Sequence, residues 1–184
     1  VSKHLNQKIC MTLKELEALK ESDKITYNDL LACTEWKNKR KEVLERDNNK
    51  CTKCGKLRTL KMWSGNNVMY FTLNKESIKN EEKIKTTDIP INLEIHHKYY
   101  VLNRFPWEYN NDALITVCRD CHQNIHDNNK IYVWDEEMIN KLVFGECSRC
   151  SGKGNFQEYK HVQGGRCFKC GGSGYNIPFE FKKR

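Results

Sequence analysis

Apolar residues recur at helical spacing in the first part of the chain. In residues 11–22, three leucines fall on one face after Thr12, a residue type that often caps helices. In residues 26–47, a second stretch carries an apolar face around Trp36 and a basic face opposite it. We therefore predict a helical N-terminal region over residues 1–50.

Beyond residue 50 the pattern changes to that of short strands. Residues 57–62 and 68–73 have strand-like composition, and the polar residues 64–67 between them predict a turn. The charged stretch 74–88 has neither pattern. We expect it to be an insertion that forms a solvent-exposed loop or a short helix.

The middle of the chain predicts two strands followed by a helix. Residues 93–101 and 113–117 are strand-like, and a helix is expected over residues 121–129. A further helix is predicted over residues 135–142, because the acidic residues at its start would complement the helix dipole. A linker at Gly145 then precedes the last segment.

Cysteine changes this picture, since the hydrophobic content is 38% and predicts only a modest core. Cysteines that are separated by two residues suit a tetrahedral zinc ion better than a framework of disulfides, which would be the alternative in a secreted chain. No apolar leader or membrane-length run occurs, so we expect a reducing, cytoplasmic setting in a bacterium or phage and no membrane partner. Cys10 and Cys33 are expected to be buried as small hydrophobic residues. The other eight of the ten cysteines form four Cys-x-x-Cys pairs: Cys51/Cys54, Cys118/Cys121, Cys147/Cys150 and Cys167/Cys170.

The last two pairs belong to an internal repeat, Cys-x-x-Cys-x-Gly-x-Gly, whose two copies begin twenty residues apart. The repeat resembles half of the DnaJ-type zinc module, in which glycine permits the tight turns. The resemblance implies a zinc ribbon-like module over residues 145–184. Three roles are open: gripping DNA, docking a protein or bracing the end of the fold. The implied ligands of its zinc ion are Cys147, Cys150, Cys167 and Cys170.

Four histidines form two pairs that suit metal chemistry. His122 and His126 are four residues apart on a predicted helix, so both imidazoles lie on one face. His96 and His97 are neighbours on a predicted strand and therefore point to opposite faces. Surface histidines and half-buried strand histidines are the respective alternatives without function.

The pattern LEIHHKYY…PWEY…ALITVC-x-x-CH-x-x-x-H, with EWKNKRKEVLERDNNKCTKCG before it, resembles the HNH nucleases of the ββα-metal fold over about residues 30–128. The resemblance implies a small, zinc-stabilised α+β protein with an HNH core over residues 51–144. It also implies a first structural zinc ion, bound by Cys51, Cys54, Cys118 and Cys121.

The resemblance assigns the histidines different roles. His97 is expected to be the general base, and His96, His122 and His126 are expected to hold one catalytic divalent metal, Mg²⁺, Mn²⁺, Ni²⁺ or Zn²⁺. The implied reaction is hydrolysis of DNA to 5′-phosphate and 3′-hydroxyl ends. Ala113 stands where the family has an asparagine that supports the base, and Asn110, Asn111 or Asp112 could replace it if the loop shifts.

The net charge of +8 is consistent with a polyanionic partner, although ordinary solubility charge is the alternative. We expect DNA, and a larger protein complex could select the target. A catalytically weakened nucleic-acid- or protein-binding protein is the second hypothesis. Trp107 is expected to pin the loop or to stack on a base. The candidate DNA contacts are Lys39, Arg40, Lys41, Arg46 and Arg104.

Overall fold

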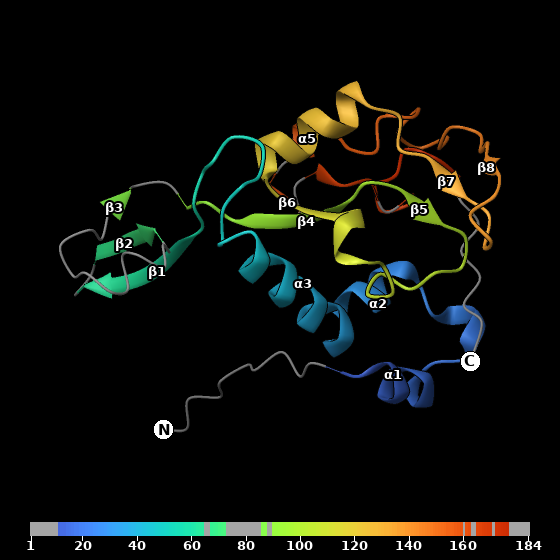
Figure 1. Ribbon diagram of the computed structural model, residues 1–184, viewed down its shortest axis with the longest axis horizontal. Coiled ribbons are helices and arrows are strands. Elements are labelled where there is room, and N and C mark those ends of the chain that lie inside the picture. Colours follow the sequence, from blue (N-terminus) through green and yellow to red (C-terminus); the bar gives the residue numbers. More distant parts are fainter. Residues whose placement is uncertain are drawn as a thin grey trace.

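The computed structural model (Figure 1) describes residues 11–64, 67–72, 86–87, 90–159, 161–162, 165–170 and 172–176. Its first elements are three short helices. Thr12 and Thr26 each begin a helix with a capping box, in which the threonine side chain and an acidic side chain three residues later accept hydrogen bonds from each other's backbone amides. The predicted helical stretches are confirmed as α1 (Leu13–Leu19), a 3-10 turn (Ser22–Lys24), α2 (Tyr27–Ala32) and α3 (Thr34–Arg46).

The predicted helix over residues 26–47 is interrupted at Cys33, whose backbone is extended. The interruption frees the Thr34 amide to donate to the Met11 carbonyl at 2.9 Å. It also lets α2 face a small core shared with α1, whereas α3 faces the main core. Apolar spacing alone could not reveal this change of partner.

The strands predicted after residue 50 are confirmed and form a hairpin. β1 (Thr59–Ser64) and β2 (Asn67–Thr72) pair in antiparallel register, and β3 (Thr86–Thr87) adds to β2. Figure 1 shows this small sheet standing away from the other strands. Of the predicted insertion 74–88, only residues 86–87 lie inside the described ranges.

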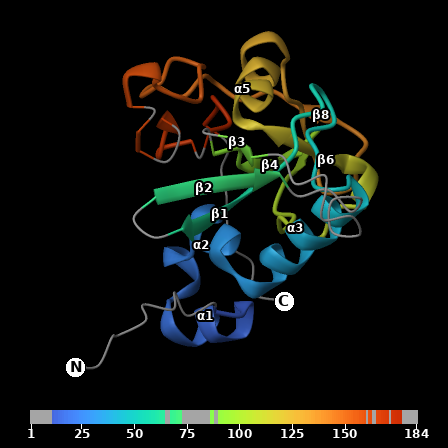
Figure 2. The same ribbon diagram turned by 90° about the vertical axis from the view of Figure 1, so that its left-hand side faces the viewer.

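The centre of the molecule is a pair of antiparallel strands, β4 (Leu93–His97) and β6 (Leu114–Cys118). Helix α5 (Arg119–Asn128) follows β6 directly. Figure 2 shows α3 on one face of the strand pair and α5 on the other. Fully buried Val43 of α3 lies in the same apolar core as Leu114 and Val117 of β6, and this core fixes the strand pair between the helices.

The helix predicted over residues 135–142 is wrong. The Asp135 carboxylate accepts hydrogen bonds from the amides of Ile139 at 2.8 Å and Asn140 at 3.0 Å, and Met138 has a positive φ of 61°. The acidic start therefore closes a turn instead of a helix. The predicted strand 93–101 is likewise divided after His97, and its second part joins another sheet: β5 (Tyr100–Val101), β7 (Val133–Trp134) and β8 (Lys141–Leu142).

The C-terminal segment lies on the α5 side of the β4–β6 pair in both views (Figures 1 and 2, orange to red). It contains a 3-10 turn (Gln157–Tyr159) and two isolated bridges, Glu146↔Tyr175 and Asn155↔Arg166. The protein thus has a small fold of mixed helix and sheet. In the described part of the chain, no helix combines the length and apolar character that a membrane span requires.

Candidate functional site

His96, His122 and His126 meet above the β4–β6 pair. Strand alternation turns His96 toward α5, where His122 and His126 lie one helical turn apart. His122 Nε2 lies 3.1 Å from His96 Nδ1 and 3.2 Å from His126 Nε2. Adjacent nitrogens of a tetrahedral or octahedral site with metal–nitrogen distances of about 2.0–2.1 Å are about 2.9–3.4 Å apart. The three side chains could therefore hold one metal ion.

The protonation of His96 and His126 also suits a ligand role. Burial, reinforced by neighbouring imidazoles, lowers the pKa of His96 to about 3 and the pKa of His126 to about 4. Both rings are therefore neutral near pH 7, which is the form that coordinates a metal.

Glu94 orients the His122 ring, a contact that we did not predict. Its Oε2 lies 2.5 Å from His122 Nδ1, and this hydrogen bond lowers the pKa of the Glu94 carboxyl. Because a carboxylate only accepts, the proton of the neutral His122 ring would sit on Nδ1, and Nε2 would present its lone pair to His96 and His126. Strand alternation could have revealed Glu94, since it precedes His96 by two residues and shares its face.

His97 occupies the opposite face of β4, as predicted for adjacent strand residues. The residue is 4% exposed. Its ring stacks on Trp36 with centroids 5.2 Å apart and places Nε2 3.1 Å from the Pro106 carbonyl oxygen. Burial lowers the pKa of His97 to about 4, so the ring is neutral near pH 7. The carbonyl accepts, so Nε2 carries the proton and Nδ1 keeps a lone pair.

A cavity of about 540 Å³ brings both faces together, because His97 and the three clustered histidines all line it. Trp36 and Tyr100 form part of the same wall. His97 and the candidate metal cluster therefore line one cavity.

Comparison of the chain with protein-family models, with curated proteins and with solved structures gave no match.

Ala113 is buried in a 3-10 turn (Asn111–Ala113) and accepts a hydrogen bond from the Lys98 amide at 2.9 Å through its carbonyl. Asn111, one of the predicted substitutes for the missing asparagine, donates its side-chain amide to Glu42 at 2.6 Å. The ring of His97 is instead held by the Pro106 carbonyl and by aromatic rings.

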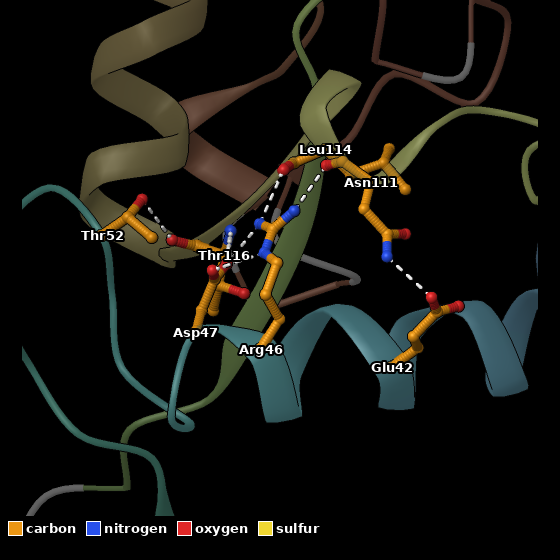
Figure 3. A network of polar contacts seen from close by, with 7 residues as sticks. All are labelled: Glu42, Arg46, Asp47, Thr52, Asn111, Leu114 and Thr116. Atoms are coloured by element: carbon orange, nitrogen blue, oxygen red, sulfur yellow. Dashed lines mark hydrogen bonds and ion pairs between the residues drawn. The ribbon is translucent and has the colours of Figure 1, made fainter.

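Arg46 holds this loop against the strand pair (Figure 3). Its guanidinium donates to the carbonyls of Asn111 at 2.5 Å and Leu114 at 2.9 Å, and it forms two hydrogen bonds with Asp47 at 2.8 Å. These contacts engage the side chain with the protein itself, so Arg46 is the least favoured of the candidate DNA contacts.

The other candidate DNA contacts lie in different surroundings. Lys39 and Lys41 approach acidic side chains of their own helix at 3.7 and 3.9 Å. Arg40 donates to the Leu93 carbonyl at 3.0 Å and lines the cavity, whereas Arg104 lies over the Tyr109 ring. Only Arg40 of the five predicted contacts thus shares the histidine cavity among the described residues.

Cys51, Cys54, Cys118 and Cys121 form the core cluster. All four sulfurs lie within 4.8 Å of one another, and the Sγ atoms of Cys54 and Cys118 are 3.6 Å apart. Tetrahedral zinc with Zn–S bonds of about 2.3 Å separates its sulfurs by about 3.8 Å, whereas a disulfide requires about 2.05 Å. The core cluster therefore fits zinc, as the resemblance predicts.

Cys147, Cys150, Cys167 and Cys170 form the C-terminal cluster, with sulfur separations of 3.9 Å for Cys147–Cys167 and 3.7 Å for Cys150–Cys170. The last glycine of each repeat is required by close backbone packing. A Cβ on Gly154 would lie 2.3 Å from the Gly172 carbonyl oxygen, and one on Gly174 would lie 2.2 Å from that of Gly152. The two repeats interlock, and this cluster could also hold one zinc ion.

Electrostatics within the core cluster favour a bound cation. Burial raises the pKa of Cys51, but backbone amides of Cys118, Cys54 and Lys53 outweigh it and lower the pKa to about 6. Burial raises the pKa of Cys121, and the hydrogen bonds with neighbouring sulfurs raise it further. The Cys51 thiolate forms readily, whereas the Cys121 thiol needs a positive ion beside it to ionise.

Proposed function

We propose that this protein is a metal-dependent HNH-type endonuclease that hydrolyses phosphodiester bonds of DNA. The observation that carries the proposal is the shared cavity, in which a three-histidine cluster lies near a neutral histidine with a lone pair. Two strands followed directly by a helix carry all four histidines, in agreement with the ββα arrangement that the resemblance implies.

His96, His122 and His126 would hold the divalent ion, and Glu94 would keep His122 in the required orientation. When bound, the ion would stabilise negative charge that develops on the phosphate and on the leaving oxygen. Three imidazole nitrogens suit Zn²⁺, Ni²⁺ or Mn²⁺, and Mg²⁺ is the harder alternative.

His97 would accept the proton of the attacking water at Nδ1. Its Nε2–H would donate to the Pro106 carbonyl, which stabilises the positive charge that the ring acquires. Trp36 and Tyr109 pack against the ring and limit its rotation. Pro106 thereby supplies the orientation that the family obtains from asparagine, so Ala113 is compatible with catalysis.

A catalytically weakened binding protein is the second candidate. It is favoured only by the absence of a supporting side chain at Ala113. Under this hypothesis the histidine cluster would hold a metal as part of the scaffold, and DNA would be bound but not cut.

Nicking of supercoiled plasmid distinguishes the two candidates. Wild type should nick DNA in at least one of Mg²⁺, Mn²⁺, Ni²⁺ or Zn²⁺ and stop when a chelator is added. His97→Ala should nick at least about 100-fold more slowly, since general-base catalysis contributes about 10²–10⁴-fold. His161→Ala removes an exposed histidine that does not line the cavity and should behave as wild type.

Two results would count against the proposal. Wild type that nicks with none of the four metals would leave the binding protein as the better hypothesis. Equal rates for His97→Ala and wild type would remove His97 from the mechanism.

A further inference from the structure

The C-terminal module forms one wall of the histidine cavity. Gly154, Asn155, Arg166 and Gly172 of this module line the same space as His96, His122 and His126. A module that only braced the end of the fold would have no reason to border this space. Residues of the module could therefore take part in the chemistry of the site.

Arg166 is the charged residue in this wall. It is half-buried, its backbone bridges to Asn155, and the next residue is the cluster ligand Cys167. Its side chain passes over Gly172, where an added Cβ would lie 3.3 Å from Arg166 Cγ and 3.6 Å from Nε. The missing side chain at Gly172 leaves the path along which Arg166 reaches the cavity.

Within the described ranges, Arg166 has no carboxylate partner in an ion pair. Arg40, which also lines the cavity, is bound instead to the Leu93 carbonyl. A guanidinium presents paired donors that match two phosphate oxygens, and it stays charged at any pH at which the protein is folded. A phosphate that enters this cavity is the anion that the guanidinium is placed to bind.

We propose that the C-terminal module supplies Arg166 to the histidine cavity as a phosphate-binding residue for the nucleic-acid backbone. This inference rests on the proposed function, since the phosphate is the one next to the bond that is cut. The C-terminal cluster then supports substrate binding as well as the fold, because it fixes the backbone beside Arg166.

The test compares Arg166→Ala and Arg166→Lys with Lys153→Ala in the full-length protein. Lys153 is an exposed lysine of the same module that does not line the cavity, so its loss changes the charge equally. Zinc content should stay near two ions per chain in all variants, which shows that the module still folds. The two readouts are nicking kinetics and binding of a fluorescein-labelled 12-base-pair duplex, followed by anisotropy without added catalytic metal.

Arg166→Ala should weaken duplex binding and lower kcat/KM by about tenfold or more, since the phosphate loses charge-assisted hydrogen bonds. The slope of log affinity against log salt should fall by about one. Arg166→Lys should recover part of the loss, because it keeps the charge without the paired donors. Lys153→Ala should change each quantity less than threefold.

Equal losses of duplex affinity and kcat/KM for Arg166→Ala and Lys153→Ala would overturn the inference. If wild type still cut DNA, the proposed nuclease function would stand. Faster cutting by Arg166→Ala would also overturn the inference, because the arginine would then hold the module closed over the site. If wild type cut nothing, the proposed function would fail, and a loss of duplex affinity specific to Arg166→Ala would still support the phosphate site.

Discussion

The two four-cysteine clusters use the same ligands but differ in how they are built. The core cluster joins residues 64 positions apart in sequence, as the contact between Cys54 and Cys118 shows. The C-terminal cluster joins residues 20 positions apart, and its two repeats close on each other through Gly154 and Gly174. A cluster made from distant segments is part of the main core, whereas a local one can be lost without unfolding that core.

The surroundings of the core cluster support this distinction. Thr116 of β6 accepts hydrogen bonds at 2.9 Å from the amide and the hydroxyl of Thr52, which stands between two cluster ligands (Figure 3). The Thr116 amide donates to Asp47 at 3.1 Å. The end of α3, the Cys51/Cys54 segment and β6 are thereby tied together, and α5, which follows β6, carries two of the three clustered histidines.

The largest effect is expected for Cys118→Ser, which removes a ligand of the core cluster. Structural zinc sites contribute about 10–16 kcal/mol in zinc-finger peptides, so losing one ligand should cost on the order of 5 kcal/mol. The melting temperature should fall by more than about 10 °C, and zinc content should drop from two ions to one. Cys33→Ser, outside both clusters, should keep both zinc ions; equal zinc loss in this control would contradict the assignment.

Cys167→Ser should be milder for stability. One zinc ion should again be lost, but the melting transition of the core should shift by less than about 5 °C, because the β4–β6 pair and α5 keep their own cluster. Nicking should still fall by about tenfold, since the backbone beside Arg166 is no longer fixed. A loss of the core transition as large as that of Cys118→Ser would show that the two clusters do not differ in this way.

Arg46→Ala tests the ties around the core cluster without touching a ligand. The substitution removes four hydrogen bonds to Asp47, Asn111 and Leu114 and should cost about 2–3 kcal/mol in urea unfolding. Lys41→Ala, an exposed position on the same helix, should change stability by less than about 0.5 kcal/mol. Similar losses of unfolding free energy for the two variants would show that the network in Figure 3 contributes little to stability.

Asp47→Asn should have the smallest effect, of about 1–2 kcal/mol, and a defined pH dependence. Burial raises the pKa of the Asp47 carboxyl, but the hydrogen bonds from Arg46 and Thr116 outweigh it, so the pKa lies below its ordinary value. The ionised carboxylate therefore stabilises the fold above the unfolded pKa of about 3.9, and this stabilisation is lost as the pH falls through the folded pKa.

The difference in urea midpoint between wild type and Asp47→Asn should stay constant from pH 8 to about 5 and shrink below about pH 4. Acid releases zinc from both proteins, so the difference between them is the informative quantity. A difference in urea midpoint that grew as the pH fell would contradict this prediction.

Sequence periodicity was a good guide wherever one element faced one partner. Strand alternation placed His96 and His97 on opposite faces, and helical spacing brought His122 and His126 together. It failed where side chains compete with backbone structure, as at Asp135, whose carboxylate closes a turn.

Contacts between distant segments were beyond the reach of the sequence pattern. Nothing in the spacing of residues 93–101 marks the end of the strand after His97, because its continuation pairs with residues that come 33 positions later. The approach of Arg166 to the histidine cavity depends in the same way on how two modules pack. Neither contact leaves a periodic signal.

The central claim is that the His96, His122 and His126 cluster is the metal centre of a DNA-cutting site, separate from the two cysteine clusters. The most direct measurement is the nicking rate of supercoiled plasmid by wild type and His96→Ala at saturating Mn²⁺, with both proteins holding two zinc ions. A metal that stabilises a phosphate transition state supplies several kcal/mol, so His96→Ala should nick at least about 100-fold more slowly. Equal rates for the two proteins would contradict the claim.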